Sequence, residues 1–136
     1  MAKWRAEQVP LNGAASAFAL AELEDRLQVP LPHDIREFYT TAGGMTDYEY
    51  DPRHLSFWNL VRVLAEPPMP PLGEGTVREF AFGDALIESH YFVFRVKTDG
   101  RVVIGHDVDP TDEEPGLERF FRRYLDDPVS LPVIIL

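Results

Sequence analysis

The spacing of apolar residues near the start of the chain predicts an amphipathic helix. Leucines recur at intervals of three and four residues and would form one stripe: Leu20, Leu23 and Leu27. The charged residues between them fall elsewhere on the helix surface. Ser16 precedes the pattern and is a typical N-cap. We therefore expect a helix over residues 16–28.

A second helix is predicted to begin at Pro32 and to end at Gly43. Proline suits a first turn because its missing N–H would have no helical partner there, and glycine suits the left-handed stop. The apolar positions between them follow the i, i+3, i+4, i+7 pattern of one helix face: Ile35, Phe38, Tyr39 and Ala42.

The middle of the chain mixes short elements with loops. Residues 46–54 are polar and aromatic and predict a loop, and Leu55 to Trp58 could form a short strand. Asn59 could cap a short helix through Leu64, although periodicity alone also permits a strand. Prolines and glycines over 67–75 exclude regular structure and predict a semi-rigid connector.

The second half of the chain predicts strands and a closing helix. Apolar and polar residues alternate over 79–82, and 90–97 places alternate residues on opposite faces. Residues 83–89 are expected to form a turn or irregular link. Asp99-Gly100 is a typical two-residue hairpin turn, so a return strand should follow over 101–106. An amphipathic helix is expected near 117–125. The order of elements predicts a single α+β domain over residues 1–136.

Composition limits the classes of partner. Among 136 residues, 13 are Lys or Arg and 23 are Asp or Glu, for a formal net charge of −10. That sign disfavours nucleic acids and anionic membranes and favours a basic protein partner. Cysteine is absent, which excludes disulfides and thiol catalysis. Residues 8–21 are too short and too polar to span a bilayer, so we expect a cytoplasmic protein.

Catalytic signals in the sequence are weak. No glycine-rich phosphate loop or nucleophile turn is present. His106, Asp107 and Asp109 could hold a metal or supply a general base, but a solvated strand end is the commoner reason for such a cluster. We therefore assign no catalytic residue, cofactor or metal from the sequence.

Two acidic segments are better suited to recognition. Residues 47–51 interleave acids with tyrosines, which supply contact area and a hydroxyl, and residues 107–114 hold five acids and no base. Together they could form an anionic patch, or they could be unrelated loops with the tyrosines packed inward. The candidate partner-binding residues are Tyr48, Glu49, Tyr50, Asp51, Asp107, Asp109, Asp112, Glu113 and Glu114.

The order of short motifs over residues 17–125 resembles the SUKH superfamily, which includes the Smi/Knr cell-wall-assembly-regulator relatives. The motifs that carry the resemblance are Leu23-Glu24-Asp25-Arg26-Leu27, Leu31-Pro32, Phe38-Tyr39, Gly43-Gly44, Phe82-Gly83-Asp84, Asp99-Gly100 and Phe120-Phe121. The resemblance implies a mostly antiparallel central sheet with helices packed on it. For most bacterial members it also implies an immunity protein that neutralises a toxin domain, often a nuclease or deaminase. It brings no catalytic residues with it.

The function expected from these observations is non-enzymatic binding of a basic toxin domain, as in a toxin–antitoxin pair. Acidic loops would cover the basic surface that the toxin uses for its polyanionic substrate. A regulatory scaffold that binds a host protein or peptide is the first alternative. A small-ligand or metal-dependent enzyme centred on His106 and Asp109 is the second.

Overall fold

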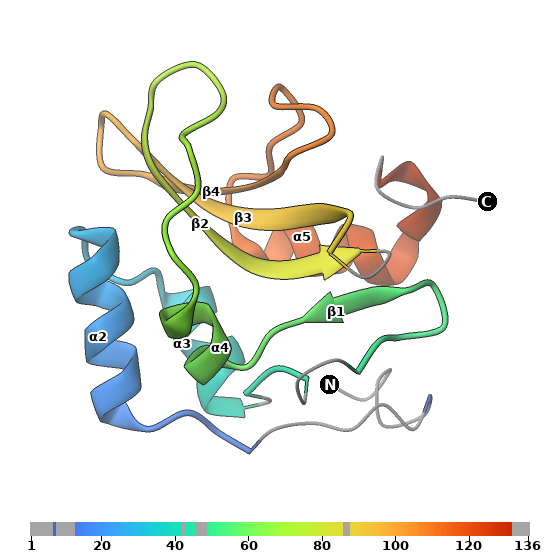
Figure 1. Cartoon of the computed structure of the whole chain (residues 1–136), viewed down its shortest axis with the longest axis horizontal. Helices are drawn as coiled ribbons and strands as arrows, with labels where there is room; N and C mark the ends of the chain where they lie inside the picture. The colour runs from blue at the N-terminus through green and yellow to red at the C-terminus, as the bar shows by residue number, and fades with distance from the viewer. Residues whose placement is uncertain (1–6, 8–12, 42, 46–48, 86–87, 132–136) are drawn as a thin grey trace.

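The computed structural model describes residue 7 and residues 13–41, 43–45, 49–85 and 88–131. Within these ranges the chain forms an α+β domain in which α-helices pack against one antiparallel sheet (Figure 1). In chain order the elements are α2 (Ala17–Leu27), α3 (His33–Thr41), β1 (Leu55–Phe57), α4 (Leu60–Ala65), β2 (Thr76–Ala85), β3 (His90–Lys97), β4 (Val102–His106), α5 (Leu117–Asp126) and the 3₁₀ helix η1 (Pro128–Ser130). The predicted fold class is confirmed.

The sheet is a curled meander with the strand order β1-β2-β3-β4. β1 pairs only with the end of β2, from Leu55 opposite Ala85 to Phe57 opposite Gly83. The prediction of a turn or irregular link over 83–89 is therefore wrong for residues 83–85, because β2 continues to Ala85 between two partner strands. A Cβ at Gly83 would lie 2.8 Å from the carbonyl oxygen of Ser56, so a side chain there would push β1 away.

The hydrophobic core lies between one face of this sheet and the α-helices α2 to α5. Phe82 and Phe94 stack with ring centroids 4.3 Å apart, and Phe120 of α5 meets Phe92 edge to face at 5.3 Å. Four of the five apolar residues expected to form the buried stripe of the last helix are buried, and Leu125 is exposed; the buried four are Leu117, Phe120, Phe121 and Tyr124. Burial of these rings is the main force that fixes α5 to the sheet.

The other face of the sheet buries a charged pair. Glu79 of β2 lies opposite Arg95 of β3, and Arg95 Nε donates to Glu79 Oε1 over 2.6 Å. Both side chains are fully buried. The guanidinium lies over Gly105, where a Cβ would be 2.3 Å from Nη1 of Arg95. Burial of this pair therefore depends on a glycine in β4.

The residues that the sequence predicts to begin or end helices have these roles in the structure. The Ser16 side chain accepts a hydrogen bond from the N–H of Ala19 at 3.1 Å, and Asn59 caps α4 through the N–H of Arg62 at 3.1 Å. Gly43 has a φ of 70° after α3. Among the described residues, no helix has both the length and the apolar character needed to cross a membrane.

Candidate partner-binding surface

In the described part of the 47–51 segment, Tyr50 and Asp51 are turned toward the interior. Glu49 is exposed, whereas Tyr50 is half-buried and its hydroxyl donates to Asp84 Oδ2 over 2.6 Å. Burial, and then this hydrogen bond, raise the pKa of the Tyr50 phenol. Tyr48 lies outside the described residues. The hydroxyl of Tyr50 is thus hydrogen-bonded within the protein.

Asp51 corrects the expectation of a surface acid. Its side chain is buried, and Oδ1 accepts hydrogen bonds from the backbone N–H groups of Arg53 and Leu55 at 2.9 Å each. Its other oxygen accepts from the hydroxyl of Tyr124 on α5. Asp51 therefore shapes the turn before β1 and ties it to α5, which removes it from any exposed patch.

Asp84, which accepts the hydrogen bond from Tyr50, lies at the centre of a cluster of buried polar side chains. Asp84 is fully buried and also accepts from Trp58 Nε1 at 2.6 Å. Arg62 lies over the Trp58 ring at 4.1 Å and pairs with Glu88 at 3.0 Å. These contacts fix the end of β2 against the start of α4.

In the segment 107–114, two of the predicted surface acids are neutralised by α5. Arg123 binds Asp112 at 2.8 and 3.0 Å and approaches Glu114 at 3.5 Å. The hydrogen bonds from Arg123 are the main reason that the pKa of Asp112 is lowered. The expectation of free carboxylates at Asp112 and Glu114 is therefore wrong, because Arg123, in the helix that follows this segment, pairs with both.

The side chain of Glu113 points away from those of Asp112 and Glu114, and two cations of β3 neutralise its charge. It accepts from Arg95 Nη1 at 3.2 Å and lies 2.8 Å from Lys97 Nζ. The direction of the Glu113 side chain follows from the backbone next to it, because Glu114 exchanges two 2.8 Å backbone hydrogen bonds with Ile104 along the edge of β4. Successive side chains of an extended segment point to opposite faces, so Glu113 reaches the Arg95 side.

The remaining acids of this segment make local contacts. Asp107 Oδ1 lies 3.4 Å from His90 Nδ1, and the N–H of Asp107 donates to the carbonyl of Tyr91. Asp109 accepts from the N–H and hydroxyl of Thr111, and these hydrogen bonds lower its pKa. Because Tyr91 lies opposite Asp84, which holds Tyr50, the structure brings Asp107 and Tyr50 to the same end of the β2–β3 pair.

His106 is buried, so the expectation of a solvated strand end is wrong. Its Nδ1 accepts from the N–H groups of Val108 and Asp109 at 3.2 Å each, and Nε2 lies 3.1 Å from Asp112. We assign the proton to Nε2 from these partners. His106 thus holds the start of the 107–114 loop. The described residues contain no group of three side chains that could hold a metal ion.

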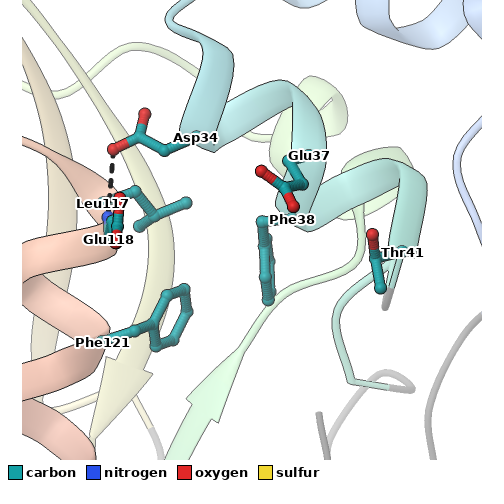
Figure 2. A pocket seen from close by; sticks show the side chains of 7 residues that line it. All are labelled: Asp34, Glu37, Phe38, Thr41, Leu117, Glu118 and Phe121. Carbon is teal, nitrogen blue, oxygen red and sulfur yellow. Dashed lines mark hydrogen bonds between the residues drawn. The ribbon is translucent and has the colours of Figure 1, made fainter.

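A groove that the sequence does not predict lies between α3 and α5, with a volume of about 400 Å³ (Figure 2). Its floor is apolar, formed by Phe38 of α3 and by Leu117 and Phe121 of α5, and its rim is acidic. The lining residues are Asp34, Glu37, Phe38, Thr41, Leu117, Glu118 and Phe121. This described lining carries three carboxylates and no cation. An anionic rim around an apolar floor suits a ligand that is both cationic and hydrophobic.

Asp34 fixes the geometry of the groove. Residue 116 is a glycine and cannot cap α5 with a side chain, so Asp34 Oδ2 accepts the N–H of Glu118 at 3.0 Å from the neighbouring helix. A Cβ at Gly116 would lie 2.8 Å from that oxygen. Asp34 Oδ1 accepts the N–H of Ile35 at 2.8 Å. Figure 2 shows the carboxylate of Asp34 reaching across to the start of α5.

The other two rim acids remain accessible to a partner. Glu37 lies 3.4 Å from His33, and Glu118 lies 3.3 Å from Arg122, all within single helices. The side chains of Glu37 and Glu118 are 67% and 73% exposed. Exposed pairs of this kind contribute little stability, so a partner's cation can replace either one. In the sequence, Glu37-Phe38 and Leu117-Glu118 each place an acid beside an apolar residue, but only the contact between the helices combines them.

Searches of protein-family models and of curated proteins return no match to this chain. The SUKH resemblance therefore stays a prediction.

Proposed function

We propose that this protein is a non-enzymatic binding module, acting as an immunity protein against a toxin domain with a basic surface. The observation that supports it most is the α3–α5 groove, where an apolar floor lies beneath Asp34, Glu37 and Glu118. This site takes the place of the acidic loops, whose carboxylates at Asp112 and Glu113 already have internal cations.

The mechanism is occlusion in two stages. The net charge of −10 attracts a basic domain over long range and can raise the association rate by roughly 10 to 10³ at low salt. Contact with Phe38, Leu117 and Phe121 then excludes water and slows dissociation. The bound module covers the surface on which the toxin would hold its polyanionic substrate. A toxin that acts on cytoplasmic substrates requires the immunity protein in the cytoplasm.

Co-expression with a toxin-like open reading frame encoded beside this one tests the proposal. We expect the wild-type protein to restore growth and to inhibit the purified toxin in proportion to its concentration. If a correctly folded excess leaves the toxin fully active, the proposal is wrong for that pair. Binding to a non-toxic host protein, with no effect on any neighbouring toxin, would favour the regulatory scaffold instead.

Variants locate the binding site within the same assay. Glu37→Arg and Glu118→Arg each reverse one rim charge on an exposed side chain. Glu22→Arg on α2 is the matched control, because it makes the same charge change on an exposed residue that does not line the groove. We expect the rim variants to lose neutralisation and the control to keep it, with far-ultraviolet circular dichroism confirming that all three are folded.

A further inference from the structure

The floor of the α3–α5 groove offers a pair of aromatic rings to its occupant. The ring centroids of Phe38 and Phe121 are 4.8 Å apart and the rings are tilted by 34°. They come from the two walls, and Figure 2 shows the ring of Phe121 extending from α5 toward α3, where Phe38 lies. Each residue keeps a small exposed fraction, 9% for Phe38 and 8% for Phe121. An incoming planar cation can therefore contact ring atoms at the bottom of the groove.

Resting on the proposed function above, we propose that the occupant of this groove is an arginine side chain of the partner protein. A guanidinium is planar and weakly hydrated, so it stacks on aromatic rings while its five N–H donors reach carboxylates in the same plane. A lysine would satisfy the rim charge but would stack poorly. A leucine would fill the floor but would leave the rim carboxylates without a cation.

The three carboxylates are arranged to receive such a group from two sides. Asp34 is held in place by the N–H groups of Ile35 and Glu118, and each of its oxygens keeps further lone pairs for an N–H donor. Glu37 on α3 and Glu118 on α5 are exposed and can turn toward the groove. Charge-assisted hydrogen bonds from one guanidinium to two walls would also fix the angle of approach.

This chain already contains the same arrangement elsewhere. Arg62 lies 4.1 Å from the centroid of a Trp58 ring and pairs with Glu88 at 3.0 Å. The groove supplies the rings and the carboxylates of such a site, and the partner supplies the arginine. A toxin that acts on nucleic acid uses arginines to hold phosphates, so binding one of them removes a substrate contact directly.

The test uses small probes and the full-length protein. N-acetyl-arginine amide, N-acetyl-lysine amide and N-acetyl-leucine amide are titrated to ~50 mM at constant ionic strength, and ¹H–¹⁵N and aromatic ¹H–¹³C NMR spectra are recorded. We expect saturable shifts at Leu117, Glu118 and the rings of Phe38 and Phe121, with the arginine probe bound about fivefold more tightly than the lysine probe. Glu118→Gln should weaken arginine binding, and Glu22→Gln should leave it unchanged.

Equal affinity for the arginine and lysine probes, stronger binding of the leucine probe, or no saturable shift at the groove would each overturn the inference. These outcomes are separate from failure of the proposed function. If the neighbouring toxin is neutralised but arginine is not preferred, the groove binds a different side chain. If arginine is preferred but no toxin is neutralised, the groove serves another basic partner and the immunity role fails.

Discussion

Arg123 holds Asp112 through both terminal nitrogens of its guanidinium, with Nη1 2.8 Å from Oδ1 and Nη2 3.0 Å from Oδ2. The two residues lie 11 positions apart and join the loop before α5 to the second half of that helix. An acid that would attract a partner if it were free is therefore part of the framework that holds the loop.

Because of this pair, the free energy of unfolding should fall as the pH is lowered into the acid range. Hydrogen bonds from Arg123 are the main reason that the pKa of Asp112 is lowered in the folded state. The ionised carboxylate therefore adds its full contribution to the free energy of unfolding above the unfolded-state pKa of about 3.9. That contribution is lost as the pH falls through the lower folded-state pKa. We expect Asp112→Asn to cost about 1–2 kcal/mol at neutral pH. The variant should also lose less stability than the wild type below about pH 4. Urea unfolding between neutral and acid pH measures both effects.

Asp99→Asn is the matched control for that prediction. Asp99 also bonds an arginine, Arg101, and its pKa is also lowered, mainly by the backbone N–H of Arg101. Both side chains are exposed, however, so solvent screens the pair. If Asp99→Asn destabilises the protein as much as Asp112→Asn does, the assigned role of the Arg123 contact is wrong.

The buried pair of Glu79 and Arg95 should show strong coupling. Replacing either partner alone leaves a charge in the interior, and we expect Glu79→Leu or Arg95→Met to cost about 3–5 kcal/mol. The double variant leaves no unpaired charge at this position and should lose clearly less than the sum of the two. Denaturant unfolding of all four proteins gives the coupling free energy, and additive losses would argue against a mutually dependent pair.

Gly105→Ala tests whether Arg95 needs a glycine beneath it. The added Cβ would lie 2.3 Å from Nη1 of a side chain that cannot move away, since it also bonds Glu79 and the carbonyl of His106. We expect a loss of about 1–3 kcal/mol in the free energy of unfolding. Gly13→Ala is the control, because nothing lies within 4 Å of its added Cβ. Equal thermal stability of the two variants would contradict this account.

Asp34 should act as a cap for a helix to which it does not belong. Asp34→Ala removes the acceptor for the N–H of Glu118, and we expect a cost of about 1 kcal/mol. Asp34→Asn keeps an oxygen at the same place and should recover most of that loss. Amide hydrogen exchange at Glu118 provides a local readout. An unchanged exchange rate in Asp34→Ala would show that the cap contributes nothing.

The sequence predicted those elements whose signals are local. Ser16 and Asn59 accept the capping hydrogen bonds expected of them, and Asp99-Gly100 connects β3 to β4. Each of these signals depends on neighbouring residues, so one sequence is enough to detect it. The sequence did not predict that β2 continues through Ala85, where it pairs both with β3 and with β1. The β1 partner is separated from β2 in the chain by α4 and the proline-rich connector, so no local signal reveals it.

The candidate site depended on long-range contacts and was predicted poorly. An acid is free or neutralised according to which cation folds against it, and Arg95, Lys97 and Arg123 lie outside the segment 107–114. The groove likewise requires α3 and α5 to pack together, although His33 and Leu117 are far apart in the chain. Composition predicts a basic partner, and only the fold shows which carboxylates remain available.

We propose that the partner binds at the acidic rim of the α3–α5 groove. Isothermal calorimetry of the purified neighbouring toxin with the wild type, Glu118→Arg and Glu22→Arg tests it most directly. We expect Glu118→Arg to raise the Kd about tenfold or more and Glu22→Arg to leave it nearly unchanged. Equal Kd values for the two variants would contradict this proposal, because the toxin would then respond to the net charge of the protein and not to this groove.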